Sequence, residues 1–313
     1  MKKKIIVRIS NEIGNQLFIY ASTFAIAKKL NRELLIDNET SFKSKKNISK
    51  YGLNNFNISS AIAEDKDKFL GVTGYLKRKI LKKFDYILKN KKFYIEKKDN
   101  KKISKYNDNI ISTNLANKTF FEGHFETEMY FSDLKERILK EFHFKDIKKY
   151  EKNPFFSKIN QENTVSVCLR QNRFIEGKNT YNQKNIKKSI QFRNEQISYI
   201  NKSIFYIKKH INNPTFYLWS NDLNNIDMSL FDSKLIKVFH NTNNIHGIDR
   251  RALDLFLISK CNHHITIPSS FNWWGAWLCP KKNKIICRPD ENFFSDFIIN
   301  NKDFWPTDWI KIS

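Results

Sequence analysis

The sequence has 313 residues, 40% of them apolar and 14% aromatic, which suffices for one or two folded cores and excludes disorder throughout the chain. Its formal net charge of +24 is spread over solvated lysine runs and is interpreted mainly as a bias of composition, with a secondary attraction to anionic partners such as a phosphate-bearing ligand or an anionic inner membrane. The runs lack the interleaved aromatics of RNA-recognition modules, so no nucleic-acid partner is expected. No stretch approaches the roughly 18 apolar residues of a membrane span, so we expect a cytoplasmic protein, peripheral at that membrane.

The first third of the chain has the pattern of a strand–helix–strand unit followed by an insertion. Residues from about 40 to 105 are lysine-rich and predict helices and loops. Within them, the one close match to a metal-binding DxD pattern, Asp65–Asp67, is interpreted as solvated charge. The elements predicted before the insertion are a strand at 3–10, a polar turn at 11–16, a helix at 17–30 and a strand at 32–37.

The middle of the chain predicts one more strand and helix and then a boundary. A strand at 119–125 precedes a helix at 132–144, for which Ser132 is the expected N-cap. The polar run 145–154 is interpreted as a linker. The two expected α/β domains are residues 1–150, with the insertion, and residues 151–313, with a C-terminal tail.

The second half alternates strands and helices and predicts a doubly wound parallel sheet, which binds ligands at the carboxyl ends of its strands. Four cysteines in this half have no zinc-ligand spacing, so we expect them to be reduced and buried, and we expect no metal site. The cysteines are Cys168, Cys261, Cys279 and Cys287. The predicted strands are 164–170, 215–220, 234–239, 263–267 and 284–288, and the predicted helices are 195–210, 251–261 and the segment after residue 270.

Two strand ends carry residues suited to binding an anion or a polar ligand. In "NEIGNQLF", Gly14 and the Asn15 amide follow a strand, although a simple turn explains them equally well. In "CLRQNRF", Arg170 ends a buried strand, where a guanidinium group is costly without an anionic partner. That partner is either a ligand or a structural carboxylate.

Two further strand ends add hydroxyl groups. "WSND" places Ser220 and Asp222 at the end of a strand, and "PSSFNWWGAW" places Ser269 and Ser270 at the start of a helix. The N-terminus of a helix binds phosphate through its backbone N–H groups, so the serines predict a phosphate-bearing ligand. The tryptophans that follow are assigned to the core.

The order of these blocks resembles the bacterial α-1,2-fucosyltransferases of glycosyltransferase family 11. The family's GGLGNQ(L/M)FQYA block is matched by Asn11–Ala21, its HxRRGDY block by Cys168–Phe174 and its F(S)DD strand end by "FYLWSNDL". Its DLxLMSxCxxxIxxxSSFSWWGAWL block is closely matched by Asp254–Leu278, and the tail Asp303–Ile312 is similar to the family's ending. Protein O-fucosyltransferases share a looser version of this pattern.

The resemblance implies a GT-B-like fold of two Rossmann-like domains facing across a cleft, without a metal or other cofactor. It implies an inverting transfer of fucose from GDP-fucose to a glycan hydroxyl, with an α-1,2 linkage, in surface polysaccharide synthesis. Arg170 and Asn15 are then the expected catalytic residues, the first as a clamp on the diphosphate. The residues expected to bind the donor are Ser269, Ser270, Phe271, Asp254, Ser220, Gly14 and Arg173.

The sequence departs from the family pattern in the middle block. Cys168 stands in place of the histidine, and Gln171, Asn172 and Arg173 replace RGD, so the acidic residue of that motif is absent. Arg173 supports the diphosphate or meets an acidic acceptor. The candidates for the base that takes the acceptor proton are Glu12, Glu122 and Glu126.

Three alternatives stay open at this point. A transferase for another nucleotide sugar fits the altered middle block. A non-catalytic relative that binds a glycan or a nucleotide would explain the missing acidic residue. A basic nucleic-acid binder would leave the strand-end motifs without an explanation.

Overall fold

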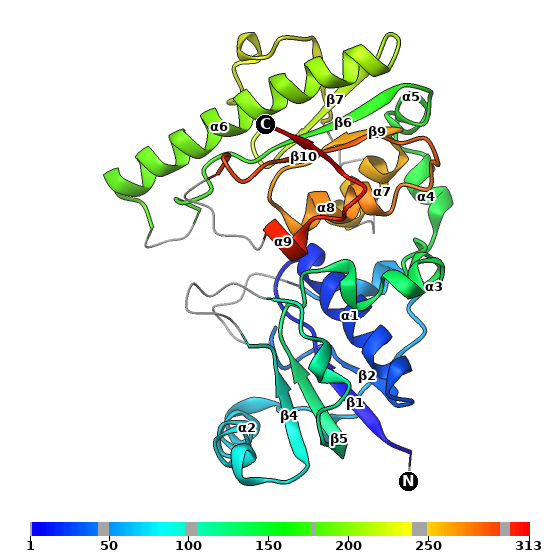
Figure 1. Ribbon diagram of the computed structural model, residues 1–313, viewed down its shortest axis with the longest axis vertical. Helices are drawn as coiled ribbons and strands as arrows, with labels where there is room; N and C mark the ends of the chain where they lie inside the picture. The colour runs from blue at the N-terminus through cyan, green and yellow to red at the C-terminus, as the bar shows by residue number, and fades with distance from the viewer. Residues whose placement is uncertain (1, 43–49, 98–104, 177–179, 240–248, 295–300) are drawn as a thin grey trace. The chain divides into compact units, whose positions relative to one another are not determined.

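The computed structural model describes residues 2–42, 50–97, 105–176, 180–239, 249–294 and 301–313. The chain forms two compact units, which Figure 1 colours from blue to red along the sequence. Unit 1 comprises Met1–Lys145 and Lys302–Phe304, and unit 2 comprises Asp146–Asn301 and Trp305–Ser313.

Unit 1 is built on a five-stranded parallel sheet in the order β3-β2-β1-β5-β4. Its strands are β1 (Lys4–Arg8), β2 (Glu33–Asp37), β3 (Ala61–Ile62), β4 (Lys91–Ile95) and β5 (Leu115–Glu122). Its helices are α1 (Ile13–Lys29), α2 (Gly71–Phe84) and α3 (Lys135–Glu141). Its 3-10 turns are Leu53–Asn55, Asp65–Asp67, Asp85–Ile87, Asp108–Ile110, Glu128–Tyr130 and Ser132–Leu134.

Helix α1 begins four residues earlier than the predicted helix, so the expectation of a polar turn over residues 11–16 is wrong for residues 13–16. The reason is Gln16, which is fully buried in the first turns of α1. Its side-chain Nε2 donates to the carbonyl oxygens of Asn11 and Lys50 at 2.7 and 2.8 Å, and its Oε1 accepts from the Gly52 N–H at 2.8 Å. A polar side chain satisfied by backbone groups is tolerated inside a core, so the polar block belongs to the helix.

The lysine-rich part of unit 1 contributes two strands, β3 and β4, to the sheet, so the expectation of helices and loops alone is wrong. Both are edge strands, and the lysines of β4 are typical of an edge that avoids pairing with other chains. The interpretation of Asp65–Asp67 as solvated charge fails for Asp67, which is buried and paired with Lys118. Residues 43–49 and 98–104 of the predicted insertion lie outside the described residues.

The segment after β5 also differs from its prediction. Residues Ser132–Leu134 form a 3-10 turn, and α3 begins only at Lys135 with Leu134 at the N-cap position, so Ser132 does not cap this helix. The polar run predicted as a linker contains the helix Ile147–Glu151. A polar run rich in lysine is typical of a linker, but it is equally typical of the exposed side of a helix.

Unit 2 is built on a six-stranded parallel sheet in the order β11-β10-β9-β6-β7-β8. Its strands are β6 (Thr164–Leu169), β7 (Thr215–Ser220), β8 (Leu235–Lys237), β9 (His263–Ile265), β10 (Ile286–Pro289) and β11 (Ile310–Ile312). Its helices are α4 (Ile147–Glu151), α5 (Phe156–Ile159), α6 (Gln183–His210), α7 (Arg250–Lys260), α8 (Ser270–Trp277) and α9 (Asn301–Phe304, which ends in unit 1), and a 3-10 turn lies at Met228–Leu230.

The core of unit 2 fixes the position of α8. Trp273 and Trp274 are fully buried, which confirms that the tryptophans belong to the core. At Gly275, a Cβ atom would lie 2.4 Å from Cγ2 of Ile258 on α7, so only glycine allows the two helices to pack this closely.

All four cysteines are buried and form no disulfide, as expected. Across the described ranges, no helix combines the length and the apolar character needed to span a bilayer.

Candidate functional site

The carboxyl edge of the unit 2 sheet brings three of the predicted strand ends together. Strand β6 lies between β7 and β9 and runs parallel to both, with Val167 in register with Leu218 and with Ile265. The chain leaves β6 through α6 to reach β7 on one side, and it reaches β9 on the other side through α7. The loops after β6 and β9 therefore diverge at a topological switch point, where open parallel sheets bind their ligands.

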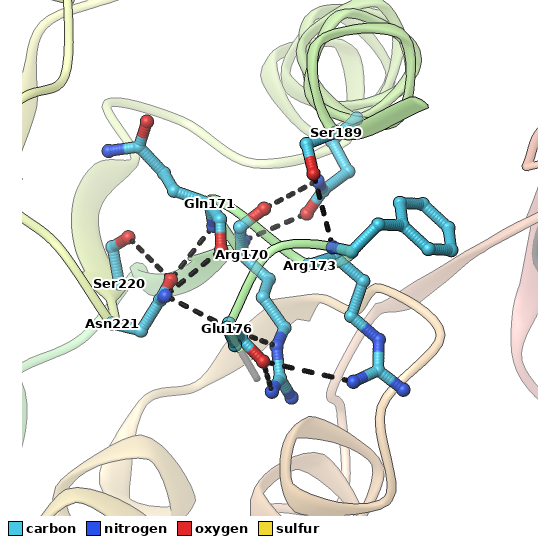
Figure 2. Close-up of polar contacts among 9 residues, drawn as sticks. Arg170, Gln171, Arg173, Glu176, Ser189, Ser220 and Asn221 are labelled. Atoms are coloured by element: carbon cyan, nitrogen blue, oxygen red, sulfur yellow. Dashed lines mark hydrogen bonds and ion pairs between the residues drawn. The ribbon is translucent and has the colours of Figure 1, made fainter. Parts of the chain in front are cut away.

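The loop after β6 is held by two side-chain amides, one buried and one exposed. Gln196 of α6 is fully buried, accepts from the Arg170 N–H and donates to the Arg170 carbonyl oxygen, each at 2.9 Å. Asn221, at the end of β7, makes the same paired contact with the backbone of Gln171, at 2.8 and 3.0 Å (Figure 2). Neither Gln196 nor Asn221 was singled out from the sequence. These two clamps fix the backbone from which the Arg170 side chain extends.

Two guanidinium groups share one carboxylate in this loop. Glu176 accepts from Nη2 of Arg170 at 2.6 Å and from its Nε at 3.2 Å, and it lies 3.9 Å from Nη1 of Arg173. Figure 2 shows both arginine side chains pointing the same way, on the side away from Ser189. Burial, and then the neighbouring Arg170, lower the pKa of Arg173, and Glu176 opposes this only in part. Two guanidinium groups side by side favour an anionic ligand.

The departures from the family motif have local explanations. Asn172, at the glycine position of RGD, has a φ of 57°, and asparagine is the residue that best replaces glycine in this left-handed region. Cys168 is buried, and burial together with the nearby carboxylate of Asp254 raises the pKa of its thiol. Asp254 of α7 therefore lies beside the end of β6, at the same edge as Arg170.

The start of α8 follows β9 at this edge. Ser269 is the N-cap residue of α8, yet within the described range 249–294 its hydroxyl group makes no cap hydrogen bond. Ser269, Ser270 and Phe271 are half-buried. The first N–H groups of a helix carry partial positive charge, so this end of α8 adds anion-binding donors to those of the arginine loop. The predicted residues that unit 2 brings to this edge are Arg170, Arg173, Ser220, Asp254, Ser269, Ser270 and Phe271.

Asn15 and Gly14 belong to unit 1, in the first turn of α1. The Asn15 side chain donates to Oε1 of Glu126 at 2.7 Å, which ties the start of α1 to the loop after β5. A second contact ties the same loops, because the Asn11 amide lies 2.7 Å from Nε2 of His124. Strands β1 and β5 are parallel neighbours, so these polar side chains lie at the carboxyl edge of the unit 1 sheet.

Glu96 fixes the loop after β5 by hydrogen bonds to its backbone. Its carboxylate accepts from the backbone N–H groups of His124 and Phe125 at 2.7 and 3.0 Å. A Cβ atom at Gly123 would lie 2.4 Å from Cβ of Glu96, so glycine is required for this approach. These contacts hold the loop that carries Glu126 in one position.

Glu122, one of the three candidate bases, is a structural carboxylate. It accepts hydrogen bonds from Arg78, from Nε at 2.6 Å and also from Nη2, and from Nζ of Lys82 at 2.9 Å, and Arg8 lies 3.6 Å away. Burial alone would raise the pKa of Glu122, but the hydrogen bonds and charges of Arg78, Arg8 and Lys82 outweigh it and lower this pKa to about 2. A carboxylate this acidic is a poor base at neutral pH.

Two parallel α/β sheets, one of them with anion-binding groups at its switch point, are the architecture expected of a GT-B glycosyltransferase. The chain belongs to glycosyltransferase family 11, whose model, described as "Glycosyl transferase family 11", matches residues 2–313.

Two curated proteins of Escherichia coli are similar to this chain over nearly their whole length. An α-1,2-colitosyltransferase is 26% identical over 313 residues, with 98% of each chain covered. The O-antigen biosynthesis glycosyltransferase WbnK is 25% identical, with 97% of this chain and 99% of WbnK covered.

Solved structures of fucosyltransferases share the fold. The NodZ α-1,6-fucosyltransferase soaked with GDP-fucose aligns with a TM-score of 0.52 at 13% identity, covering 90% of this chain and 94% of NodZ. Another structure of NodZ, from Bradyrhizobium, aligns with a TM-score of 0.51 at 15% identity, covering 90% of this chain and 95% of that one.

We predict that Glu122 stabilises unit 1 in a pH-dependent way. Its pKa in the folded state, about 2, lies below the ordinary value of 4.5, so its contribution is complete above pH 4.5 and is lost as the pH falls towards 2. Glu122→Gln should lower the free energy of unfolding at pH 7 by about 3 kcal/mol, because three cations lose their shared partner.

Urea unfolding between pH 7 and pH 2 measures this effect, with the exposed Glu12→Gln as the matched control. The difference between wild type and Glu122→Gln should shrink below pH 4.5. Equal stability of the two proteins at pH 7 would contradict the assignment.

We also predict that Glu176 competes with an anionic ligand for Arg170. The side chains of this pair are about one-third exposed, so the ion pair is screened by solvent and is displaced at little cost. Glu176→Gln should therefore bind GDP about three- to tenfold more tightly than wild type, as measured by isothermal titration calorimetry. Glu162→Gln, an exposed substitution elsewhere in unit 2, is the control, and weaker GDP binding by Glu176→Gln would contradict the prediction.

Proposed function

We propose that this protein transfers fucose from GDP-fucose to a hydroxyl group of a glycan, forming an α-1,2 linkage with inversion and without a metal, in the synthesis of O-antigen or another surface polysaccharide. The observation that carries the proposal is the convergence of Arg170, Arg173 and the start of α8 on one sheet edge. The structures of NodZ soaked with GDP-fucose and co-crystallised with GDP support a GDP-linked donor. A specific observation favours a second donor: the colitosyltransferase among the relatives supports transfer of a colitosyl group.

The unit 2 groups would act on the leaving diphosphate. When the bond between the anomeric carbon and the diphosphate breaks, negative charge grows on the β-phosphate. The guanidinium groups of Arg170 and Arg173 and the first N–H groups of α8 would stabilise this charge. The Gln196 and Asn221 clamps already hold the backbone of the arginine loop, and the tryptophan core already holds α8. Ser220 and Asp254, at the same edge, are proposed to contact the nucleotide.

The unit 1 groups would act on the acceptor. Of the three candidate bases, Glu122 is occupied by its cations, and Glu12 is an exposed N-cap residue. Glu126 is half-buried and is oriented by the Asn15 amide, so we propose that it takes the proton from the attacking hydroxyl group. Asn15 then acts as a positioning residue through Glu126.

We also propose that the protein works close to a membrane. The net charge of +24 favours a protein that works at the surface of an anionic inner membrane.

We predict that Arg170→Ala lowers kcat for transfer from GDP-fucose by roughly 10²–10³, with Arg170→Lys intermediate. Arg170 is 38% exposed, so the thermal midpoint should stay close to that of wild type. Release of GDP and formation of product, measured with EDTA present and with a galactoside acceptor, test this. A panel of GDP-fucose, GDP-colitose, UDP-sugars and dTDP-sugars identifies the donor.

A loss smaller than about tenfold would remove Arg170 from the clamp role. Binding of GDP-fucose without turnover in wild type, over a range of acceptors, would favour the non-catalytic relative instead. A strict requirement for a divalent metal would contradict the metal-independent mechanism.

We predict that Glu126→Gln lowers kcat by roughly 10²–10⁴ and removes the acidic limb of the pH–rate profile. Glutamine still accepts from Asn15, so the loop after β5 should keep its structure and the thermal midpoint should not move. Glu12→Gln is the matched control and should leave kcat unchanged. Glu126→Gln with nearly wild-type turnover and an unchanged pH profile would contradict the role of the base.

A further inference from the structure

Helix α2 exposes a continuous apolar row. Val72, Leu76, Ile80 and Phe84 are spaced four residues apart and so follow one another along one side of the helix. Each of them is at least half exposed, and Val72 reaches 76%. Within α2, all of whose residues lie in the described range 50–97, none is buried.

The opposite side of α2 is anchored to unit 1. Arg78 and Lys82 reach Glu122 of β5, and Leu81 is half-buried. A Cβ atom at Gly74 would lie 2.4 Å from the backbone carbon of Phe69, so the first turn of the helix packs closely against the segment that precedes it. Figure 1 shows α2, in cyan, beside β4 at the margin of the unit 1 sheet. These contacts fix which side of the helix faces inward, and the apolar row lies on the other side.

The apolar surface continues past the end of the helix. Tyr86 and Ile87, in the 3-10 turn Asp85–Ile87, are 77% and 63% exposed, and Tyr75 lies beside the row on α2. Single exposed apolar side chains are common on proteins, but a contiguous group of them is typical of a surface that binds another protein or a membrane.

Lysines surround the row. Lys77 lies on one side of it, Lys79 and Lys83 lie on the other, and all three are exposed. Lys89 and Lys92, also exposed, follow the turn. The long apolar stems of lysines can lie along an apolar surface while their charges reach outward.

We propose that α2 and the turn Asp85–Ile87 form a membrane-docking surface that lies in the plane of an anionic bilayer. The row Val72, Leu76, Ile80 and Phe84 would enter the boundary between headgroups and acyl chains, and the surrounding lysines would contact anionic headgroups. A helix with an apolar side, a cationic margin and low net hydrophobicity has the chemistry of an interfacial helix. The lysine charge selects this occupant over a second copy of the chain, because pairing two such surfaces would bring like charges together.

This inference rests on the part of the proposed function that places the protein at an anionic membrane, and it names the element that makes the contact. Vesicle binding needs no donor, acceptor or turnover. A failure of docking therefore leaves the transfer experiments intact, and a failure of transfer leaves docking intact.

The test is flotation of the full chain with vesicles of phosphatidylcholine alone or with about 30% phosphatidylglycerol. Wild type should bind the anionic vesicles and bind the neutral ones much more weakly. The double variant Leu76→Glu/Ile80→Glu should bind at least about tenfold more weakly than wild type. The matched control Ile190→Glu/Phe205→Glu makes the same charge change at two exposed apolar side chains of α6 and should stay within about threefold of wild type.

The charge contribution is tested separately. Lys77→Gln/Lys79→Gln/Lys83→Gln should weaken binding to anionic vesicles and flatten its dependence on salt. Thermal unfolding should show the same midpoint for every variant, because all the substituted side chains are exposed.

Three outcomes would overturn the proposal. The first is that wild type binds no anionic vesicles, and the second is that the two double variants bind them equally. The third is a wild-type dimer, seen by sedimentation without lipid, that Leu76→Glu/Ile80→Glu converts to a monomer, which would assign the row to a contact between copies.

Discussion

The parallel pairing of β6 with both β7 and β9 is the constraint on which the site of unit 2 depends. Because the crossovers on the two sides run in opposite directions, the loops after β6 and β9 separate at the carboxyl edge of the sheet. The Gln196 clamp then fixes the backbone of Arg170, and the packing of Gly275 against Ile258 fixes α8. The backbone of the arginine loop and the start of α8 are therefore fixed by packing before any ligand arrives.

Among the described residues, three groups of positive charges have different consequences. Around Glu122, three cations share one buried carboxylate, and their role is to hold α2 and two strands together. Around Glu176, two arginines share a carboxylate that is partly exposed, so an anionic ligand can compete for them. Along α2, exposed lysines border apolar side chains, and their charge is directed outward. Net charge alone does not distinguish these uses. The first two differ in the burial of the partner carboxylate, and the third differs in that the lysines lie beside apolar side chains.

Much of the fold and the main site positions could be predicted from the sequence. Buried β-rich runs alternating with helices indicate a parallel sheet, and in such a sheet the residues directly after the strands share an edge. This reasoning places Arg170, Ser220 and Ser269 correctly at one edge. Elements without a periodic pattern were missed: β4 is a lysine-containing edge strand, and the first twelve residues of α6 are mostly polar.

The contacts that hold the site could not be predicted in the same way. Gln196 is 26 positions from Arg170, and Asn221 is 50 positions from Gln171, so no local pattern joins them. Glu122 could be taken for a base because its three cations come from β1 and α2, whose placement beside β5 only the structure shows. Glu126 stands in the same stretch of sequence, and only its contact with Asn15 distinguishes it.

The central claim is that Arg170 and the start of α8 together hold the diphosphate of a nucleotide-sugar donor. A crystal structure of the protein with GDP tests it most directly. The account predicts that β-phosphate oxygens lie about 3 Å from the Arg170 guanidinium group and from the N–H groups of Ser270 or Phe271. GDP bound elsewhere, with its phosphates away from both groups, would contradict the account.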